Sequence, residues 1–218
     1  MTILPAKTKA IILDFDGTIA DSSEIFIESL EAVLGREQRL SNQEIEELRK
    51  LSTKEIIRKL GIKKWQLPRI LARGKTEVTR RIDRVKLFAG MPEVLTKLSK
   101  NQQLYILSSN SEANITKVLD RHDLSGYVTK IYGDIGLLGK AQGLKKLLKR
   151  ENLKRTECVY VGDETRDLKA SRKVKIDCVL VGWGYGDPDT LKSYNPSAFA
   201  SKPQDLLKLR PGRLREGV

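Results

Sequence analysis

The segment AIILDFD, residues 10–16, constrains the fold more than any other. Its first four residues are apolar and lead into two aspartates, Asp14 and Asp16. An apolar run without polar alternation predicts a central strand of a parallel sheet, because crossover helices cover both faces of such a sheet. Side chains two residues apart in an extended chain point the same way, so both carboxylates would meet at the strand's carboxyl end, where open α/β sheets bind ligands. Taken alone, the pair is equally compatible with an Asx turn closed by Gly17.

Composition limits the class of protein. The chain has 218 residues, of which 39% are hydrophobic and 32% charged, as expected for a soluble globular protein with a substantial core. No stretch approaches the roughly 20 apolar residues of a membrane span, and the N-terminus has no apolar signal-peptide core, so we expect a cytoplasmic protein without membrane association. The chain has two cysteines and one histidine, which are too few side chains to favour a structural zinc site or a histidine-based triad.

The net charge is +13, and this excess of basic residues favours anionic partners. Part of the excess is local, since residues 139–155 contain seven basic residues and one glutamate. The leucines of this segment follow the spacing of an ordinary amphipathic helix with a solvated basic face. Aromatic residues make up only 6% of the chain and do not interleave with the basic helix as a stacking platform would. Nucleic acid is therefore not the expected partner.

The second part of the chain alternates strand and helix patterns with short links. This alternation predicts an α/β fold, a doubly wound, Rossmann-like parallel sheet that the strand at 10–14 can join through right-handed crossovers. The expected strands are 103–108, 128–132, 158–161 and 178–181, and the expected helices lie near 92–100, 112–121, 140–151 and 164–174.

Residues 22–85 have a different pattern, with helix following helix and no convincing strand. Capping-box patterns at 41–44 and 52–55 indicate two of the helix starts. We therefore predict an all-helical domain at 22–85, inserted into an α/β core formed by residues 1–21 and 86–218. The sequence does not indicate an oligomeric state.

Three further polar elements follow predicted strands of the same sheet. Ser109 and Asn110 follow one strand, where they could cradle an anion or cap a helix. Lys140 opens the basic helix, where it could reach the sheet edge or stay on the surface. Asp163 follows another strand and Asp167 lies one helical turn further on, although Asp163 alone could be a simple helix cap. Together with the first two aspartates, these groups supply what phosphoryl transfer needs: an oxygen nucleophile, a proton donor, oxygen ligands for a hard cation, and a cationic group.

The ordered set of DFDGT, a strand-terminal serine before asparagine, a lysine and GDxxxD resembles the haloacid dehalogenase superfamily of magnesium-dependent phosphohydrolases. The resemblance extends over nearly the whole chain. The surrounding segments GMPEVLTKL, YVGDETRDLKAS and VGWGYGDPDTL are similar to the phosphoglycolate-phosphatase-like branch, which carries a helical cap.

The resemblance implies a role for each motif residue. Asp14 would be the nucleophile that forms an aspartyl phosphate, and Asp16 would be the general acid that protonates the leaving oxygen and then activates water. Asp14, the backbone carbonyl of Asp16, and Asp163 would hold Mg²⁺. Asp167 would orient metal-bound waters or Lys140.

The resemblance also implies the groups that contact the substrate. Ser109, the backbone amide of Asn110, and Lys140 would bind the phosphoryl oxygens. In capped relatives the inserted helices close over the site and determine specificity, which favours small phosphorylated metabolites, with phosphoglycolate suggested by analogy. The candidates for this role, which could equally be exposed helix charges, are Arg49, Lys50 and Lys54.

The motif residues argue against some of the other reactions of this superfamily. Relatives that dehalogenate lack the second aspartate, and the phosphonate-cleaving type resembles DxAGT, so Asp16 argues against both. Phosphomutases share all the core motifs, and the cap that distinguishes them cannot be recognised in one sequence. A polyanion-binding protein without activity is a further alternative, but every motif residue stands here with suitable chemistry. The prediction is therefore a phosphomonoester hydrolase, with a mutase as the main alternative.

Overall fold

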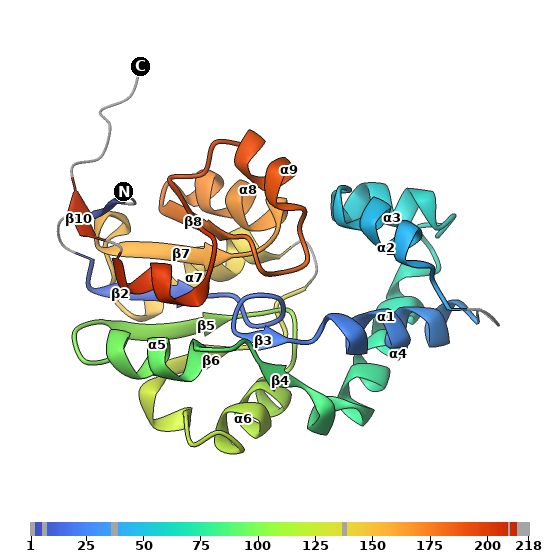
Figure 1. Cartoon of the computed structure of the whole chain (residues 1–218), viewed down its shortest axis with the longest axis horizontal. Helices are drawn as coiled ribbons and strands as arrows, with labels where there is room; N and C mark the ends of the chain where they lie inside the picture. Colours follow the sequence, from blue (N-terminus) through green and yellow to red (C-terminus); the bar gives the residue numbers. More distant parts are fainter. Residues whose placement is uncertain (1–2, 6–7, 36–38, 137–138, 209, 213–218) are drawn as a thin grey trace.

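The computed structural model describes residues 3–5, 8–35, 39–136, 139–208 and 210–212. A six-stranded parallel sheet forms its centre, in the order β6-β5-β2-β7-β8-β9 (Figure 1). This arrangement confirms the predicted doubly wound α/β fold, with the first apolar run at the middle of the sheet. The strands are β2 (Ala10–Leu13), β5 (Gln103–Leu107), β6 (Lys130–Tyr132), β7 (Cys158–Gly162), β8 (Asp177–Val181) and β9 (Ala198–Ala200).

Strand β2 is buried on both faces, as its uninterrupted apolar run predicts. Ile11 and Leu13 point into one hydrophobic cluster, whereas Ala10 and Ile12 point into the other. Strands β5 and β7 pair with β2 on either side, so that Ile12 lies opposite one residue of each. Helices cover the two faces: α5 (Met91–Leu98) and α6 (Glu112–Asp120) on the first, and α7 (Lys140–Arg150), α8 (Thr165–Val174) and α9 (Pro188–Ser193) on the second.

The shortest elements were not predicted from the sequence. Strand β9 and the small pair β1 (Ile3–Pro5) and β10 (Arg210–Gly212) have three residues each. Three residues are too few to display a period of two, so the partner strand decides whether they pair. Strand β6 begins two residues later than expected, because Ser125–Tyr127 forms the 3₁₀ turn η2 just before it.

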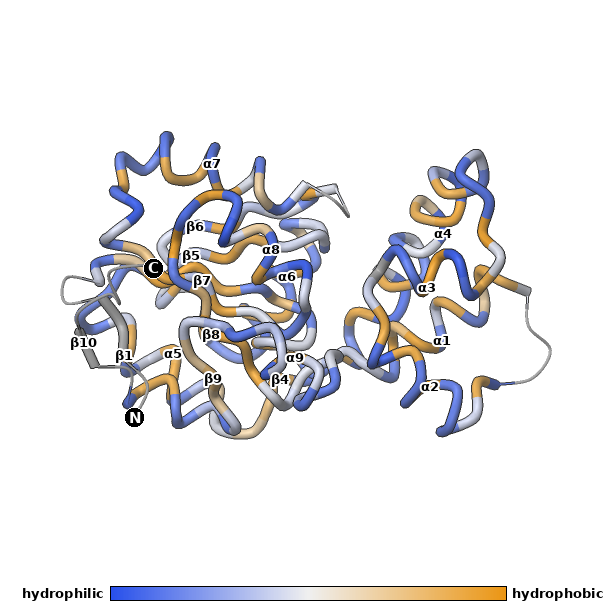
Figure 2. Tube along the Cα trace, turned by 90° about the horizontal axis from the view of Figure 1, so that it is seen from above, coloured by the Kyte–Doolittle hydropathy of each residue, from blue (hydrophilic) through white to orange (hydrophobic). Residues whose placement is uncertain are grey.

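Four helices lie beside the sheet as a separate group, which is called the helical unit below (Figure 2). They are α1 (Ser23–Leu34), α2 (Asn42–Arg49), α3 (Thr53–Lys59) and α4 (Leu67–Arg80), followed by the 3₁₀ turn η1 (Ile82–Arg84). The chain enters the unit after β3 (Ala20–Asp21) and leaves it at β4 (Lys86–Leu87), and these two strands pair antiparallel. The entry and the exit are therefore adjacent.

Local signals explain several features of these helices. Ser41 and Glu44 form the predicted capping box at the start of α2. Trp65, a large side chain for which we expected packing in a core or hinge, is instead 74% exposed on the helical unit. No helix within the described ranges has the length and apolar character needed to cross a membrane.

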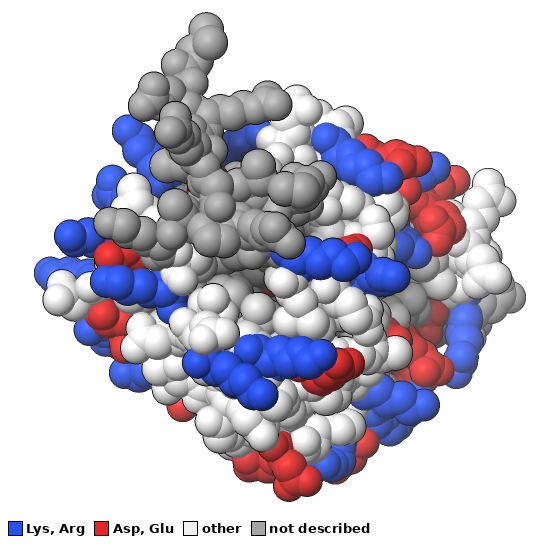
Figure 3. Space-filling model, turned by 60° about the vertical axis from the view of Figure 1, so that its left-hand side comes forward, with Lys and Arg blue, Asp and Glu red and all other residues white. Residues whose placement is uncertain are grey.

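The basic residues are dispersed over the face of the molecule shown in Figure 3. On the face in Figure 3, lysine and arginine side chains lie among acidic and neutral ones and form no continuous stripe. Helix α7 has the predicted amphipathic pattern, since Leu144, Leu147 and Leu148 are buried against the sheet. Its lysines are accordingly a solvated helix face, apart from Lys140 at its first turn.

Glu28 connects the two ends of the helical unit. Its carboxylate accepts hydrogen bonds from Arg84 at 2.7 and 3.0 Å and from Arg81 at 3.2 Å. The hydrogen bond from Arg84 is the main cause that lowers the pKa of Glu28. A lowered pKa in the folded state means that the stabilisation is complete above the ordinary carboxyl pKa and is lost as the pH falls through the folded-state value.

We therefore expect Glu28→Gln to lower the thermal midpoint at pH 7 by about 2–4 °C, which corresponds to about 1 kcal/mol. The difference from the unmodified protein should shrink as the pH falls from 7 through the lowered folded-state pKa of Glu28, below which the carboxylate is protonated in both states. Differential scanning calorimetry across this pH range measures both effects. Glu24→Gln is the matched control, because Glu24 is 74% exposed and lies 3.8 Å from Arg84. A pH-independent difference would contradict the assigned ion pair.

Candidate active site

The carboxyl end of β2 places Asp14 at the centre of the site. The backbone amide of Asp14 continues the sheet ladder by donating to the Val161 carbonyl at 2.8 Å. One carboxylate oxygen accepts the Phe15 amide at 2.8 Å, and the other accepts a hydrogen bond from Lys140. The carboxylate is buried and held in one orientation.

Two more carboxylates come from the end of β7 and the start of α8. Oxygen atoms of Asp14, Asp163 and Asp167 lie within 4.8 Å of one another, and all three residues are buried. Asp163 accepts hydrogen bonds from the Thr18 hydroxyl at 3.2 Å and from the Tyr185 amide at 2.7 Å. The Asp167 carboxylate accepts the backbone amide of Glu164, the N-cap residue of α8, at 3.0 Å, as the N3 residue of a capping box does.

Glycines allow the chain to pass close to Asp163. Gly17 has a φ of +76°, and a Cβ atom at this position would lie 2.1 Å from the Asp163 carboxylate. A Cβ atom at Gly184 would lie 2.3 Å from the Asp163 side chain and 2.3 Å from the Gly17 carbonyl. A side chain at either position would displace the carboxylate, which accounts for the glycines of DFDGT and GWGYG.

Lys140 joins the end of β2 to the first turn of α8. It is buried at the first position of α7 and donates hydrogen bonds to both Asp14 and Asp167. Its ammonium group also lies 5.8 Å from the centre of the Tyr160 ring. A lysine at a helix N-terminus opposes the helix dipole, so the two carboxylates offset both this effect and the burial of the charge. Asp167 thus contacts Lys140, as one of its two expected roles requires.

The burial of these acids changes their proton affinity. Burial raises the pKa of Asp14 to about 6, although the charge of Lys140 acts in the opposite direction. Burial also raises the pKa of Asp163, and the charges of the neighbouring acids add to the increase. Such groups favour a bound cation, which would offset the repulsion between them. The donors are carboxylate oxygens only, and this set fits Mg²⁺ in chemistry.

Asp16 stands apart from the three clustered carboxylates. Its carboxylate accepts a hydrogen bond from the Ser22 hydroxyl at 2.7 Å and from the Asn110 side chain at 3.1 and 3.3 Å. Burial raises the pKa of Asp16, and these hydrogen bonds act against the increase. The group is therefore shifted towards its protonated form.

The predicted phosphate-binding residues lie at the end of β5, on the same edge of the sheet. Ser109 is half-buried at this edge. The backbone amide of Asn110, predicted to bind a phosphoryl oxygen, donates instead to the Ser108 hydroxyl at 3.1 Å. The side-chain amide of Asn110 donates to Asp16. The Asn110 amide therefore has another acceptor here, and its contact with phosphate stays a prediction.

The candidate specificity residues lie where α2 and α3 approach the core. Arg49 donates to the carbonyls of Tyr185 at 3.1 Å and Gly184 at 3.2 Å, so its guanidinium joins the helical unit to the core. Lys50 and Lys54 are exposed. A hydrogen bond from Thr190 is the main cause that lowers the pKa of Asp187, with Lys50 and Arg49 as further causes.

Sequence reasoning missed four residues of the site. Thr18 and Ser22 lie within and just after the first motif, and Tyr185 lies in the glycine-rich GWGYG segment. Arg166 lies inside GDETRD and pairs with Glu164 at 2.8 Å. Burial raises the pKa of Asp14 and Asp16, and the charge of Arg166 is one of the causes that limit this increase. Only their position next to recognised motif residues could have indicated them.

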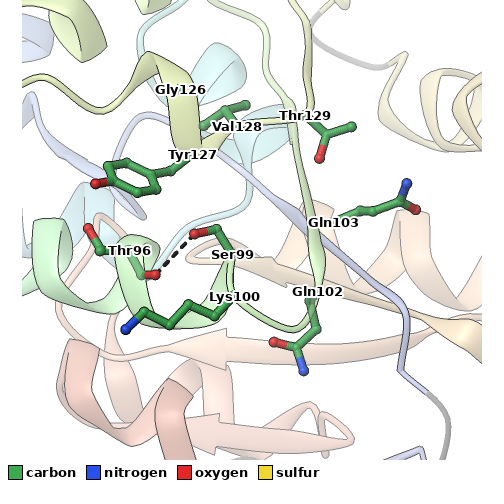
Figure 4. Close-up of a pocket in the computed structure, with 9 residues that line it drawn as sticks. All are labelled: Thr96, Ser99, Lys100, Gln102, Gln103, Gly126, Tyr127, Val128 and Thr129. Carbon is green, nitrogen blue, oxygen red and sulfur yellow. Dashed lines mark hydrogen bonds between the residues drawn. The ribbon is translucent and has the colours of Figure 1, made fainter.

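A surface hollow of about 520 Å³ lies at the opposite end of the sheet (Figure 4). Gln103, at the amino end of β5, lines it together with Thr96 and Thr129. The Ser99 hydroxyl donates to the Thr96 carbonyl at 3.0 Å beside it. The hollow is therefore distinct from the carboxylate cluster, which lies at the carboxyl ends of the strands.

Comparison with known proteins agrees with this geometry. The family model for haloacid dehalogenase-like hydrolases matches residues 11–181. A phosphoglycolate phosphatase of Synechococcus elongatus is 34% identical over 203 residues, which cover 92% of this chain and 96% of that protein. A second phosphoglycolate phosphatase, of Aquifex aeolicus, is 27% identical and covers 95% and 99% of the two chains.

A solved structure of a haloacid dehalogenase-like hydrolase from Streptococcus pneumoniae shares the fold, with a TM-score of 0.76 and 21% identity. It covers 93% of this chain, and this chain covers 98% of it. The extent of these matches and the arrangement of the strand-end carboxylates and lysine lead to one conclusion: the chain belongs to the haloacid dehalogenase-like hydrolase family.

Proposed function

We propose that this protein is a Mg²⁺-dependent phosphatase that hydrolyses a small phosphomonoester through an aspartyl phosphate on Asp14. The observation that carries the proposal is the convergence of Asp14, Asp163, Asp167 and Lys140 at one edge of the sheet. A buried, oriented carboxylate next to further acids and one buried ammonium group is suited to attack a phosphoryl group and to balance its charge.

The first half of the reaction transfers the phosphoryl group to the protein. A carboxylate oxygen of Asp14 attacks phosphorus, the bond from phosphorus to the ester oxygen breaks, and Asp16 gives its proton to the departing oxygen. Lys140 holds Asp14 and supplies positive charge where the phosphoryl oxygens bind. Mg²⁺, held by Asp14, Asp163 and the backbone carbonyl of Asp16, would neutralise charge on the phosphoryl group.

The second half releases phosphate. Asp16, now a carboxylate, accepts a proton from water as the water oxygen attacks phosphorus, and the bond to Asp14 breaks. The surroundings of Asp16 suit both roles. Burial raises its pKa, so it can carry the proton, while the hydrogen bonds from Ser22 and Asn110 limit the increase.

The substrate is expected to be small and anionic. Residues 22–85 act as a cap domain over the core of residues 1–21 and 86–218, and a closing cap excludes large substrates. The relatives named phosphoglycolate phosphatase support a short phosphate ester that carries a carboxylate. Exposed Lys50 and Lys54, on the helical unit, are the remaining candidates to contact that second anionic group.

A panel of phosphomonoesters, assayed for phosphate release with and without Mg²⁺, tests the proposal directly. The panel includes 2-phosphoglycolate, glycerol phosphate, a sugar phosphate, a nucleotide and 4-nitrophenyl phosphate. We expect turnover that depends on Mg²⁺ and falls by at least about 10³-fold in Asp14→Asn, because the amide is nearly isosteric but a poor nucleophile.

Three outcomes would each contradict a part of the proposal. Equal turnover in Asp14→Asn would mean that Asp14 is not the nucleophile. Conversion of a sugar phosphate into an isomer without release of phosphate would identify a mutase instead. A phosphorylated peptide or polynucleotide that is cleaved much faster than every small ester would contradict the closed cap.

Removing one glycine tests the packing around Asp163. Gly184→Ala places a methyl group against Asp163 and the Gly17 carbonyl, so we expect it to weaken Mg²⁺ binding by at least about 10-fold. Isothermal titration calorimetry with Mg²⁺ measures this effect without turnover. Gly126→Ala is the matched control, since a Cβ atom there meets nothing within 4 Å. Unchanged binding in Gly184→Ala would argue against Asp163 as a ligand.

The net charge of +13 should assist the capture of anionic substrates. We expect kcat/KM to fall about 3-fold or more as the ionic strength rises from about 0.02 M to about 0.5 M, because salt screens long-range attraction. The decrease should be smaller in kcat, which is measured at saturation. A kcat/KM that does not respond to salt would exclude electrostatic steering.

A further inference from the structure

Tyr185 lies at the end of a short hydrogen-bond chain that leads to Asp16. Its phenol oxygen is 2.6 Å from the Ser22 hydroxyl, which donates to Asp16 at 2.7 Å. A serine hydroxyl has one proton, and Ser22 gives this proton to the carboxylate. The Tyr185 phenol must therefore donate to Ser22, so the chain runs in one direction from phenol to hydroxyl to carboxylate.

The same tyrosine is held by the helical unit. Its ring stacks on Phe26 of α1, with ring centres 5.6 Å apart and planes inclined by 26°. Its carbonyl accepts a hydrogen bond from Arg49 at the end of α2. The Arg49 carbonyl in turn accepts the Asp187 amide at 3.2 Å, so two helices of the unit contact the loop around Tyr185.

A second chain reaches Asp16 from the other side. Asn110 donates to Asp16, and the Asn114 side chain donates both to Asn110 at 2.9 Å and to Thr79 of α4 at 3.0 Å. The carboxyl group of Asp16 thus lies between two hydrogen-bond chains. One ends on Thr79 of the helical unit, and the other ends on Tyr185, whose ring stacks on that unit. The orientation of the Asp16 carboxyl group depends on the position of that unit over the core.

From these contacts we infer that Tyr185 is a positioning residue: it orients the Asp16 carboxyl group through Ser22 when the helical unit is seated on the core. This inference rests on the proposed role of Asp16 as the acid that protonates the leaving oxygen. Tyr185 does not touch the reacting atoms. In the first half of the reaction its effect is confined to the transfer of the Asp16 proton to the ester oxygen as the bond from that oxygen to phosphorus breaks.

The leaving group of the substrate separates this role from a merely structural one. An alkoxide leaves only when it receives a proton, whereas 4-nitrophenolate is a weak base and leaves without one. The parameter kcat/KM covers the steps up to the departure of the leaving group, so it isolates the step in which Asp16 acts as an acid. A variant that misplaces Asp16 should therefore lose kcat/KM selectively for alkyl esters.

The test compares Tyr185→Phe with the unmodified protein on two substrates, the alkyl phosphomonoester with the highest kcat/KM in the panel and 4-nitrophenyl phosphate. The phenylalanine keeps the ring against Phe26 and removes only the hydroxyl. We expect kcat/KM to fall at least about 10-fold for the alkyl ester and less than about 2-fold for the aryl ester. An equal decrease for both substrates, or no decrease, would overturn the inference.

Further variants complete the design. Ser22→Ala should give the same selective decrease in kcat/KM for the alkyl ester. The variant that combines Ser22→Ala with Tyr185→Phe should show a decrease no greater than the larger of the two single ones, because both residues act through one hydrogen-bond chain. Additive losses would contradict the chain. Tyr127→Phe removes a phenol hydroxyl that is remote from the site, and it should leave kcat/KM unchanged for both substrates. The thermal midpoint of each variant, measured in parallel, identifies any loss that results from unfolding.

Asp16→Asn separates the inference from the proposed function beneath it. We expect this variant to show a larger selective loss on the alkyl ester, about 10²-fold or more. If kcat/KM falls equally for both substrates in Asp16→Asn, Asp16 is not the acid, and the inference falls with the proposed function. The same holds if the unmodified protein hydrolyses no alkyl ester. If Asp16→Asn shows the selective loss and Tyr185→Phe does not, only the role of Tyr185 is wrong.

Discussion

Three buried carboxylates with oxygen atoms within 4.8 Å of one another are the feature on which the rest of the site depends. Asp14, Asp163 and Asp167 would repel one another without compensation, and Lys140 supplies one positive charge to two of them. The surrounding chain is shaped to permit this crowding. Glycines pass against Asp163, and backbone amides at strand and helix ends donate to the carboxylates. A bound Mg²⁺ would offset the remaining repulsion, which is why the proposed cofactor and the observed geometry agree.

The two aspartates of DFDGT have different surroundings, and this difference supports the division of roles between them. Burial raises the pKa of Asp14 to about 6, and the adjacent Lys140 ammonium group acts in the opposite direction by favouring the ionised form that a nucleophile needs. Burial raises the pKa of Asp16, which favours the protonated form that an acid needs, while its neutral hydrogen-bond donors limit the increase. The neutral donors also connect Asp16 to the helical unit through Tyr185 and Asn114. Closure over a substrate and orientation of the acid are thereby linked in one set of contacts.

The accuracy of the sequence-based predictions varied with the length of the pattern. Four apolar residues before Asp14 were enough to predict β2 at the centre of the sheet, because burial on both faces requires such a run. The leucines of α7 likewise predicted its buried face. Strand β9 was missed because three residues carry no period. The positive charge of Arg49 suggested a contact with the substrate. In the structure its guanidinium donates hydrogen bonds to two backbone carbonyls of the core.

The sequence by itself determined the sheet, the order of the motifs and the residues at the strand ends, since hydrophobic periodicity and motif chemistry are local properties of the chain. Only the tertiary structure decided which polar groups meet. Ser22 and Tyr185 are 163 residues apart, and their hydrogen bond exists because the GWGYG loop folds back over the first motif. The same holds for Lys140 and Asp14, which are 126 residues apart. A hydrogen bond depends on position to within a fraction of an ångström, and the packing of whole layers determines that position.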